Sequence, residues 1–391
     1  MENTPLAFRT HITIFGNTNA GKSALFNKLI GQDMMIVSEV SGTTTDPVTK
    51  AMELLPYGPV ALTDTAGLGD FSEIGEERIK KTKKLLQRTD FALYAADGTA
   101  FDENAYQAAC KDFQDLHIPH LLVFTKSDLP GQTALYPNAP RVSVQDDSSL
   151  EQLKKLLAEE LGKLKPLEET MIGNLLPAGS TVLLIVPIDS EAPKGRLILP
   201  QVQFLRDCLD HGMKCIVCRD SELADTLREH PNIDLAVTDS QVFAFADRTV
   251  PPEVKLTSFS MLMANMKCGL EDFIRGTESI NHLKDGSRIL MAEACTHNTS
   301  HEDIGRVKIP NILRKRTGKD LLFDFYAYHD FPADLDKYDL VIHCGGCMIN
   351  ARSMQNRVEF CRRAGVPVTN YGVVLAYASG ILDRAKQIFI S

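Results

Sequence analysis

The chain has 391 residues, 44% of them hydrophobic and 24% charged, and this length favours two or three domains that each bury a core. Its formal net charge of −9 makes it a poor general binder of nucleic acid, although a local basic patch is still compatible with that charge. Because no apolar run could span a bilayer and the first residues lack a signal-peptide pattern, we expect a cytoplasmic protein.

The first part of the chain predicts alternating strands and helices. Strands are expected at "HITIFG", "PVALTDTAG", "DFALYAAD" and "HLLVFTKSD", and helices at "GKSALFNKLIG", "GEERIKKTKKLLQRT" and "SSLEQLKKLLAEELGKL". The last two strands are almost wholly apolar, as in a parallel sheet that is covered on both faces. The pattern predicts an α/β fold, with a doubly wound domain over residues 1–168.

A P-loop pattern follows the first predicted strand and begins the first helix, which is the context that such a motif requires. Its glycines let main-chain N–H groups point at phosphates, while Lys22 reaches the terminal phosphates and Ser23 offers a hydroxyl to Mg²⁺. The candidate phosphate-binding residues are Gly16, Asn17, Asn19, Ala20, Gly21, Lys22, Ser23 and Ala24.

Two further patterns fit the same nucleotide site. Asp64 ends a predicted strand in "DTAG", where its carboxylate can hold the Mg²⁺ shell while the Gly67 amide meets the terminal phosphate. The run Thr43-Thr44 lies between the two motifs, where a loop can supply a threonine to the metal. We therefore name Lys22, Thr44, Asp64 and Gly67 as the candidate catalytic residues.

The identity of the base is indicated by "TKSD" at the end of another predicted strand. The Asp128 carboxylate can accept two hydrogen bonds from the N1 and amino groups of guanine, which adenine does not present together. Thr125 and Lys126 belong to the same motif. The expected nucleotide is therefore GTP, bound with Mg²⁺, rather than ATP.

Together these motifs resemble those of GTPases of the Era and MnmE type. The resemblance implies GTP hydrolysis to GDP and phosphate, and it assigns Ser143 and Val144 to a turn that contacts the base. Leu68 stands where Ras-like enzymes carry a water-positioning Gln. Asn19 and the loop 42–46 match positions that hold a potassium ion in MnmE-like members, so the resemblance implies slow hydrolysis that K⁺ stimulates.

Two smaller α/β domains are expected after a boundary rich in proline and glycine at 165–180. The first, over 175–258, has no recognisable chemistry, and we interpret it as a dimerisation domain because exposed strands such as "TVLLIV" would need covering. The second, over 262–391, contains the predicted strands "SRILMAEAC", "YDLVIHCGGC" and "VPVTNYGV".

This last domain carries a cysteine and histidine pattern. Cys295 and His297 follow one apolar strand, and His343, Cys344 and Cys347 follow another. Because ligands at the carboxyl ends of neighbouring parallel strands can converge, we expect one metal centre there. The residues alone allow either a structural zinc ion with a Cys₃His set or an iron–sulfur cluster with one weakly held iron.

The GTPase domain followed by this pattern resembles the HydF family, the GTP-hydrolysing scaffolds of FeFe-hydrogenase maturation, over the whole chain. The resemblance implies that Cys295, Cys344 and Cys347 ligate a 4Fe-4S cluster. His297 and His343 are candidate ligands or supporting donors, with Glu302 as an alternative at the fourth iron. It also implies a homodimer or tetramer that receives a di-iron precursor from two radical-SAM maturases and passes it to apo FeFe-hydrogenase.

Nucleotide and cluster are expected to act through a switch, because nothing in the cluster segment resembles a GTP contact. Ordering of loops by the terminal phosphate would gate partner docking. Two rival functions remain at this point: an RNA-modification or ribosome-assembly GTPase with a structural zinc site, and an electron-transfer or sensor protein. The net charge weighs against the first, and an exchangeable iron weighs against the second.

Overall fold

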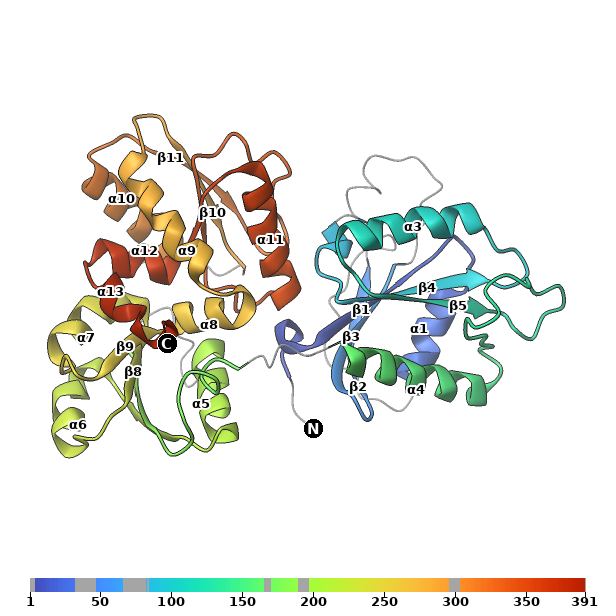
Figure 1. The fold of residues 1–391 in the computed structure, drawn as a ribbon, viewed down its shortest axis with the longest axis horizontal. Coiled ribbons are helices and arrows are strands. Elements are labelled where there is room, and N and C mark those ends of the chain that lie inside the picture. The colour runs from blue at the N-terminus through green and yellow to red at the C-terminus, as the bar shows by residue number, and fades with distance from the viewer. Residues whose placement is uncertain are drawn as a thin grey trace. The chain divides into compact units, whose positions relative to one another are not determined.

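The structure, a computed structural model, describes residues 4–31, 47–65, 82, 84–164, 170–188, 197–294 and 303–390. The chain divides into two compact units, Met1–Leu167 and Glu168–Ser391 (Figure 1). Within the described ranges, no helix has both the length and the apolar character needed to cross a membrane.

The first unit is built on a five-stranded sheet in the order β2-β3-β1-β4-β5. All neighbours are parallel except β2 and β3. The strands are β1 (Thr10–Phe15), β2 (Val48–Leu54), β3 (Gly58–Asp64), β4 (Phe91–Asp97) and β5 (His120–Thr125), and the helices are α1 (Lys22–Ile30), α3 (Glu103–Asp115) and α4 (Asp147–Lys163). The predicted α/β fold is confirmed.

Helices cover both faces of this sheet (Figure 1). Leu25 of α1 and Leu153 of α4 share one buried cluster with Ile14 of β1. Phe113 of α3 belongs to a second cluster, which contains Phe15 of β1. Neighbouring residues of β1 point to opposite faces, so the almost wholly apolar strands are explained by two cores, one on each side.

The second unit contains two four-stranded parallel sheets (Figure 1). One has the order β7-β6-β8-β9, and the other has the order β11-β10-β12-β13. The strands are β6 (Thr181–Ile185), β7 (Lys214–Cys218), β8 (Leu235–Thr238), β9 (Lys255–Ser258), β10 (Arg288–Ala292), β11 (Leu322–Tyr326), β12 (Leu340–His343) and β13 (Val368–Asn370). The helices are α5 (Leu199–Asp210), α6 (Leu223–Glu229), α7 (Phe243–Thr249), α8 (Phe259–Cys268), α9 (Glu271–Thr277), α10 (Ile309–Thr317), α11 (Ala351–Ala364), α12 (Tyr371–Ala378) and α13 (Leu382–Ala385).

One hydrophobic core joins the two sheets of this unit. Leu183 of β6 and Val341 of β12 belong to the same buried cluster, together with Met261 of α8. The C-terminal segment packs back on the first sheet, where the guanidinium of Arg384 donates to the main-chain oxygens of Val250, Pro251 and Val254. The expected stretches 175–258 and 262–391 thus hold one sheet each and share a core.

The exposed strand of the middle region differs from the one that the sequence suggested. β6, the "TVLLIV" strand, lies between β7 and β8, and its Val182 and Leu184 are fully buried. β7 is an edge strand, and its Val217 is 47% exposed. β7 is therefore an edge strand that needs covering, and β6 is not. The sequence could not show this, because an apolar run is equally compatible with a central and with an edge position.

Candidate functional site

The P-loop connects β1 to α1 with a backbone that requires glycine. Gly16 has a φ of 138°, and a Cβ at this position would lie 2.0 Å from the main-chain oxygen of Ala95 on β4. Gly21 has a φ of 79° and is the N-cap of α1. The loop can therefore approach β4 closely and present the N-terminus of α1 to phosphate oxygens.

The catalytic candidates Lys22 and Asp64 lie at the loop and at the end of β3. Lys22 is buried, and its Nζ donates to the main-chain oxygens of Gly16 and Asn17 at 2.7 and 2.6 Å. Asp64 is 4% exposed, and its Oδ1 is buried with no hydrogen-bond partner among the described residues. A buried carboxylate oxygen is costly without a partner, so Asp64 fits a role in the Mg²⁺ shell.

The base-binding candidates come from two neighbouring loops. The Ser127 amide donates to the Val142 oxygen at 3.1 Å, which brings the loop after β5 beside the turn that contains Ser143 and Val144. Thr125 is buried, and its hydroxyl donates to the Ala20 oxygen at 2.7 Å, which ties β5 to the P-loop. Asp128 is exposed, as a carboxylate that receives a guanine must be.

Asp97 at the end of β4 is a residue of this site that the motifs do not name. Its carboxylate lies 2.6 Å from Nζ of Lys126. Burial acts to raise the pKa of Asp97, but the hydrogen bonds from Lys126 and Thr99 outweigh it and lower the pKa. A cavity of about 340 Å³ extends from here to the P-loop and is lined by Asn17, Thr18, Asn19, Ala20, Tyr94, Ala96, Asp97, Ala100, Phe101 and Asp102.

Part of each predicted site lies outside the described residues. For the nucleotide these are Thr43, Thr44 and Gly67, and for the metal centre they are Cys295 and His297. Leu68 and Glu302 lie outside as well.

The second site begins where three parallel strands end at one level. Ala292 of β10 pairs in register with His343 of β12, which pairs with Asn370 of β13. Cys295 follows β10 by three residues, and Cys344 follows β12 directly. The predicted meeting of these segments at the carboxyl edge of one sheet therefore agrees with the strand order.

Cys344 occupies a position suited to a thiolate. Its Sγ accepts the main-chain N–H of Ala294 at 3.0 Å and that of Gly346 at 3.4 Å. Burial, followed by the charge of Cys347, raises the pKa of the Cys344 thiol to about 11, although these N–H groups act to lower it. A bound cation would supply the positive charge that favours the ionised form of this sulfur.

The Cys-Gly-Gly-Cys turn between the two thiols depends on Gly346. Its φ is 70°, and a Cβ there would lie 2.4 Å from Cε of Met354. A Cβ on Gly345 would lie 3.3 Å from Oγ of Ser260. The expectation that small residues remove obstacles to this turn is therefore met at Gly346, which needs both the positive φ and the space.

His343 is held by both of its ring nitrogens. Nδ1 lies 2.8 Å from the Cys344 oxygen, and Nε2 lies 2.8 Å from a guanidinium nitrogen of Arg357. A guanidinium can only donate, so Nε2 is the acceptor and Nδ1 carries the proton. Burial lowers the pKa of His343 to about 3, helped by the charge of Arg357. In this arrangement His343 supports the cysteine turn.

The described residues hold only part of a metal site. Among them, no three His, Cys, Asp or Glu side chains are placed to bind one metal ion. Cys344 and Cys347 are free thiols, both partly exposed. Two thiols on one turn, one of which accepts main-chain N–H bonds, are the donor chemistry that zinc and iron–sulfur sites share.

Family models match three consecutive stretches of the chain. Residues 11–126 match a model described as 50S ribosome-binding GTPase. Residues 171–268 match the hydrogen maturase F dimerization domain, and residues 271–388 match the hydrogen maturase F tetramerization domain. The two maturase models together cover more than half of the chain. The chain belongs to the hydrogen maturase F family.

Relatives of this maturase are found for its N-terminal unit. The tRNA modification GTPase MnmE of Xanthomonas oryzae pv. oryzae (strain PXO99A) is 39% identical over 151 residues, which are 38% of this chain and 33% of that protein. MnmE of Dichelobacter nodosus (strain VCS1703A) is 36% identical over 160 residues, 39% of this chain and 35% of that protein. The chain thus spans about a third of the length of these curated relatives.

A solved structure, the G domain of the T. maritima FeoB iron transporter, matches 39% of this chain and 98% of its own, with 19% identity and a TM-score of 0.31. The family model and the MnmE relatives make the N-terminal unit of the maturase a GTPase domain, with GTP or GDP and Mg²⁺ as ligands. The domains that follow make it an oligomer-forming maturase.

Three side chains that support the cysteine turn of the maturase escape a motif search. Lys267 of α8 donates to the Gly346 oxygen, Arg357 of α11 donates to His343, and Asn370 donates to the Cys344 oxygen at 3.3 Å. All three are at most 5% exposed. A lysine inside the apolar run "SMLMANMKC" is the one signal that could have pointed to a buried charge.

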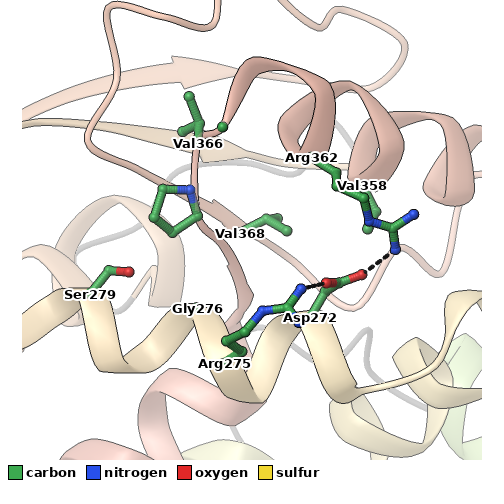
Figure 2. Close-up of a pocket in the computed structure, with 10 residues that line it drawn as sticks. Asp272, Arg275, Gly276, Ser279, Val358, Arg362, Val366 and Val368 are labelled. Atoms are coloured by element: carbon green, nitrogen blue, oxygen red, sulfur yellow. Dashed lines mark hydrogen bonds and ion pairs between the residues drawn. The ribbon is translucent and has the colours of Figure 1, made fainter.

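A second cavity, of about 320 Å³, lies near the amino end of β13 (Figure 2). Figure 2 shows the Asp272 carboxylate between the guanidinium groups of Arg275 and Arg362, with the Arg362 contact at 2.7 Å. None of the predicted site residues lines it. It lies at the sheet edge opposite to the cysteine turn, and both arginine side chains are mostly exposed.

Proposed function

We propose that this maturase is a GTP-hydrolysing scaffold that binds a 4Fe-4S cluster, carries a di-iron precursor and delivers it to apo FeFe-hydrogenase. The observation that carries the proposal is the Cys344 thiol, which receives two main-chain N–H groups at the carboxyl edge of a maturase-domain sheet. One of these donors, Ala294, immediately precedes Cys295. Cys295, Cys344 and Cys347 would be the three thiolate ligands.

The chemistry of the donor set supports a cluster that is not fully enclosed. Three thiolates leave one iron without a protein sulfur, and an iron of that kind can bind a second metal fragment. The Arg357 bond occupies Nε2 of His343, so this histidine acts as a supporting donor in our proposal. The fourth iron is left to His297, Glu302 or the cargo.

The nucleotide acts in this proposal as a timer for partner docking. Lys22 and the P-loop amides bind the phosphates, while Ser23, Thr44 and Asp64 serve the Mg²⁺ ion. Asn19 has a φ of 61° and an exposed side chain, which leaves it accessible for the potassium ion that we propose to stimulate hydrolysis. Equal hydrolysis rates in K⁺ and Na⁺ would refute the potassium role.

The partners in this proposal are two radical-SAM maturases, the apo-hydrogenase and further copies of this chain. The dimerization-domain match and the exposed β7 edge support pairing through β7, because an edge strand offers unpaired N–H and C=O groups to another strand. If the GTP- and GDP-loaded forms bound the two radical-SAM maturases equally well, the docking switch would have to be abandoned.

The rival function is an RNA-modification or ribosome-assembly GTPase with a structural zinc ion. The names of the GTPase relatives favour it, but these relatives match the N-terminal unit only. The net charge of −9 opposes it.

Delivery can be tested with apo FeFe-hydrogenase. The protein is first loaded by the two radical-SAM maturases, and hydrogen evolution of the hydrogenase is then measured. We expect activation by the wild type, loss of activation with Cys347→Ser, and retention with Cys268→Ser, which changes a partly exposed thiol on α8. Full activation by Cys347→Ser would contradict the proposal.

A further inference from the structure

The middle region of the maturase contains a Cys-x-x-Cys sequence whose two thiols are separated by the sheet. Cys215 and Cys218 both lie on β7, and residues three apart on a strand point to opposite faces. On one face, the Cys218 thiol is hydrogen-bonded to Thr226 of α6. On the other, α5 packs against β7, and the Cys215 thiol is hydrogen-bonded to that of Cys208. The sequence spacing therefore suggests one pair of thiols, and the structure brings a different pair together.

The Cys208 and Cys215 thiols belong to one helix, turn and strand. Cys208 lies in the last turn of α5 and is fully buried. The chain then turns at Gly212, which has a φ of 67°, and the Met213 amide donates to the Cys208 oxygen at 2.8 Å. Cys215 follows on β7, in register with Val182 of β6. Because the two thiols are already in contact, a disulfide would not require α5 and β7 to move far.

The two thiols differ in exposure and in acidity. Cys215 is partly exposed on an edge strand, whereas Cys208 is buried. The hydrogen bond that Cys208 donates lowers the pKa of Cys215, although burial acts to raise it. The same bond, followed by burial, raises the pKa of Cys208. A partly exposed thiol of lowered pKa beside a buried thiol is an arrangement in which the first can attack and the second can resolve the product.

We propose that Cys215 and Cys208 form a thiol–disulfide exchange site, in which Cys215 attacks a low-molecular-weight disulfide and Cys208 resolves the product. The Cys215 thiolate bonds to one sulfur of that disulfide, whose S–S bond breaks and releases one thiolate. Cys208 then attacks the Cys215 sulfur and releases the second thiolate. The protons of the two cysteines end on the two released thiols. The chain gains a Cys208–Cys215 disulfide, and the small disulfide is reduced to two thiols.

This site is independent of the proposed cluster. Cys208 and Cys215 lie in the stretch that matches the dimerization domain, whereas Cys295, Cys344 and Cys347 lie in the stretch that matches the tetramerization domain. Formation of the disulfide would tie the exposed edge strand β7 to α5. Two thiols that only fill the core would behave differently, because buried structural cysteines are inert toward disulfides.

The test treats the full-length protein with glutathione disulfide under anaerobic conditions, blocks the remaining thiols by alkylation and maps tryptic peptides by mass spectrometry. Trypsin cleaves after Lys214, so Cys208 and Cys215 fall in separate peptides that only a disulfide joins. We expect this linked pair in the wild type and its loss on treatment with dithiothreitol. Cys208→Ser should stop at a mixed disulfide of Cys215 with glutathione, and Cys215→Ser should leave Cys208 unmodified.

Cys218→Ser is the matched control, because it changes a thiol of the same strand that points to the opposite face. It should give the linked pair like the wild type, and in the wild type limiting alkylation should modify Cys215 at least about tenfold faster than Cys218. Wild-type protein in which Cys208 and Cys215 both stay free would overturn the proposal, as would loss of the linked pair in Cys218→Ser. If Cys208→Ser fails to fold, as judged by circular dichroism, the wild type and Cys218→Ser still decide.

Discussion

The two sites of this maturase share a position in their sheets and differ in how they are held. Both lie at the carboxyl ends of parallel strands, where open α/β sheets bind ligands. The nucleotide loop is shaped mainly by its own backbone, through the positive φ values of Gly16 and Gly21. The cysteine turn is held by side chains that are distant in sequence, such as Lys267 and Asn370.

This difference explains why a short motif is enough to predict the nucleotide loop. A short motif is not enough to predict all the residues that hold the cysteine turn. A backbone cradle needs particular residues only within eight consecutive positions. A turn that is fixed by remote buried donors requires the tertiary fold before its environment can be known. Substitutions that disturb the nucleotide loop should therefore leave the cysteine turn intact, and substitutions at the cysteine turn should leave the nucleotide loop intact.

The largest effect is expected for Gly16→Ala in the nucleotide loop. The added Cβ would lie 2.0 Å from the Ala95 oxygen, and the φ of 138° disfavours any side chain. Because neither backbone can yield easily, we expect GTP affinity to fall at least about 100-fold, a cost of about 3 kcal/mol. Binding of a fluorescent GTP analogue measures this, and iron loading should be unchanged.

Gly162→Ala is the control, since it lies in the middle of the last turn of α4 with open space around it. It should bind GTP like the wild type and gain up to about 1 kcal/mol in stability from helix propensity. Normal GTP affinity in Gly16→Ala would show that the backbone cradle is less constrained than we describe.

A smaller effect is expected for Gly346→Ala in the cysteine turn. The positive φ costs about 1–2 kcal/mol for an L-residue, and Met354 must also move away from the new Cβ. We expect lower thermal stability of the second unit in calorimetry and reduced iron retention, with unchanged GTP affinity. Gly286 also has a positive φ, of 82°, but a Cβ there would meet only open space. Gly286→Ala therefore measures the stability cost of the positive φ without a steric clash. Equal losses in the two variants would refute the role of Met354.

A last effect, on stability alone, is expected at the ion pair of Glu293 and Arg306. The Glu293 carboxylate is 2% exposed and lies 2.9 Å from a guanidinium nitrogen of Arg306, while the Arg306 side chain is 38% exposed. Glu293→Gln should therefore lower the unfolding free energy of the second unit by about 1–3 kcal/mol. Glu359→Gln removes surface ion pairs with Arg362 and Arg363 and should cost less than about 1 kcal/mol. The reverse ranking, read by calorimetry, would contradict the account.

The sequence predicts the central strands of all three sheets but misses three edge strands. β2, β9 and β11 carry the sequences "VTKAMEL", "KLTS" and "LFDFY", in which polar residues interrupt the apolar pattern. An edge strand is only partly buried, so hydrophobicity along it is a weak signal. The same limit explains why "TVLLIV" could be recognised as a strand without its central place in the sheet.

The candidate residues show a similar division. The motifs predict that Lys22, Asp64 and Thr125 gather around the P-loop, and the structure has Asp64 beside Ile14 of β1 and Thr125 hydrogen-bonded to Ala20. They do not predict Asp97, since a single Asp after a strand is common, nor Arg357, whose role depends on α11 packing against His343. The roles of Cys295 and His297 stay predictions, because these residues lie outside the described ranges.

The central claim is that Cys295, Cys344 and Cys347 carry a 4Fe-4S cluster beside an independent GTPase site. Low-temperature EPR of the anaerobically reconstituted, dithionite-reduced protein tests it most directly, with wild type beside Cys295→Ser and Cys268→Ser. We predict a reduced 4Fe-4S signal that persists in Cys268→Ser and is lost or sharply altered in Cys295→Ser. One tightly bound zinc ion and no iron signal in the wild type would contradict the claim and favour a GTPase with a structural metal.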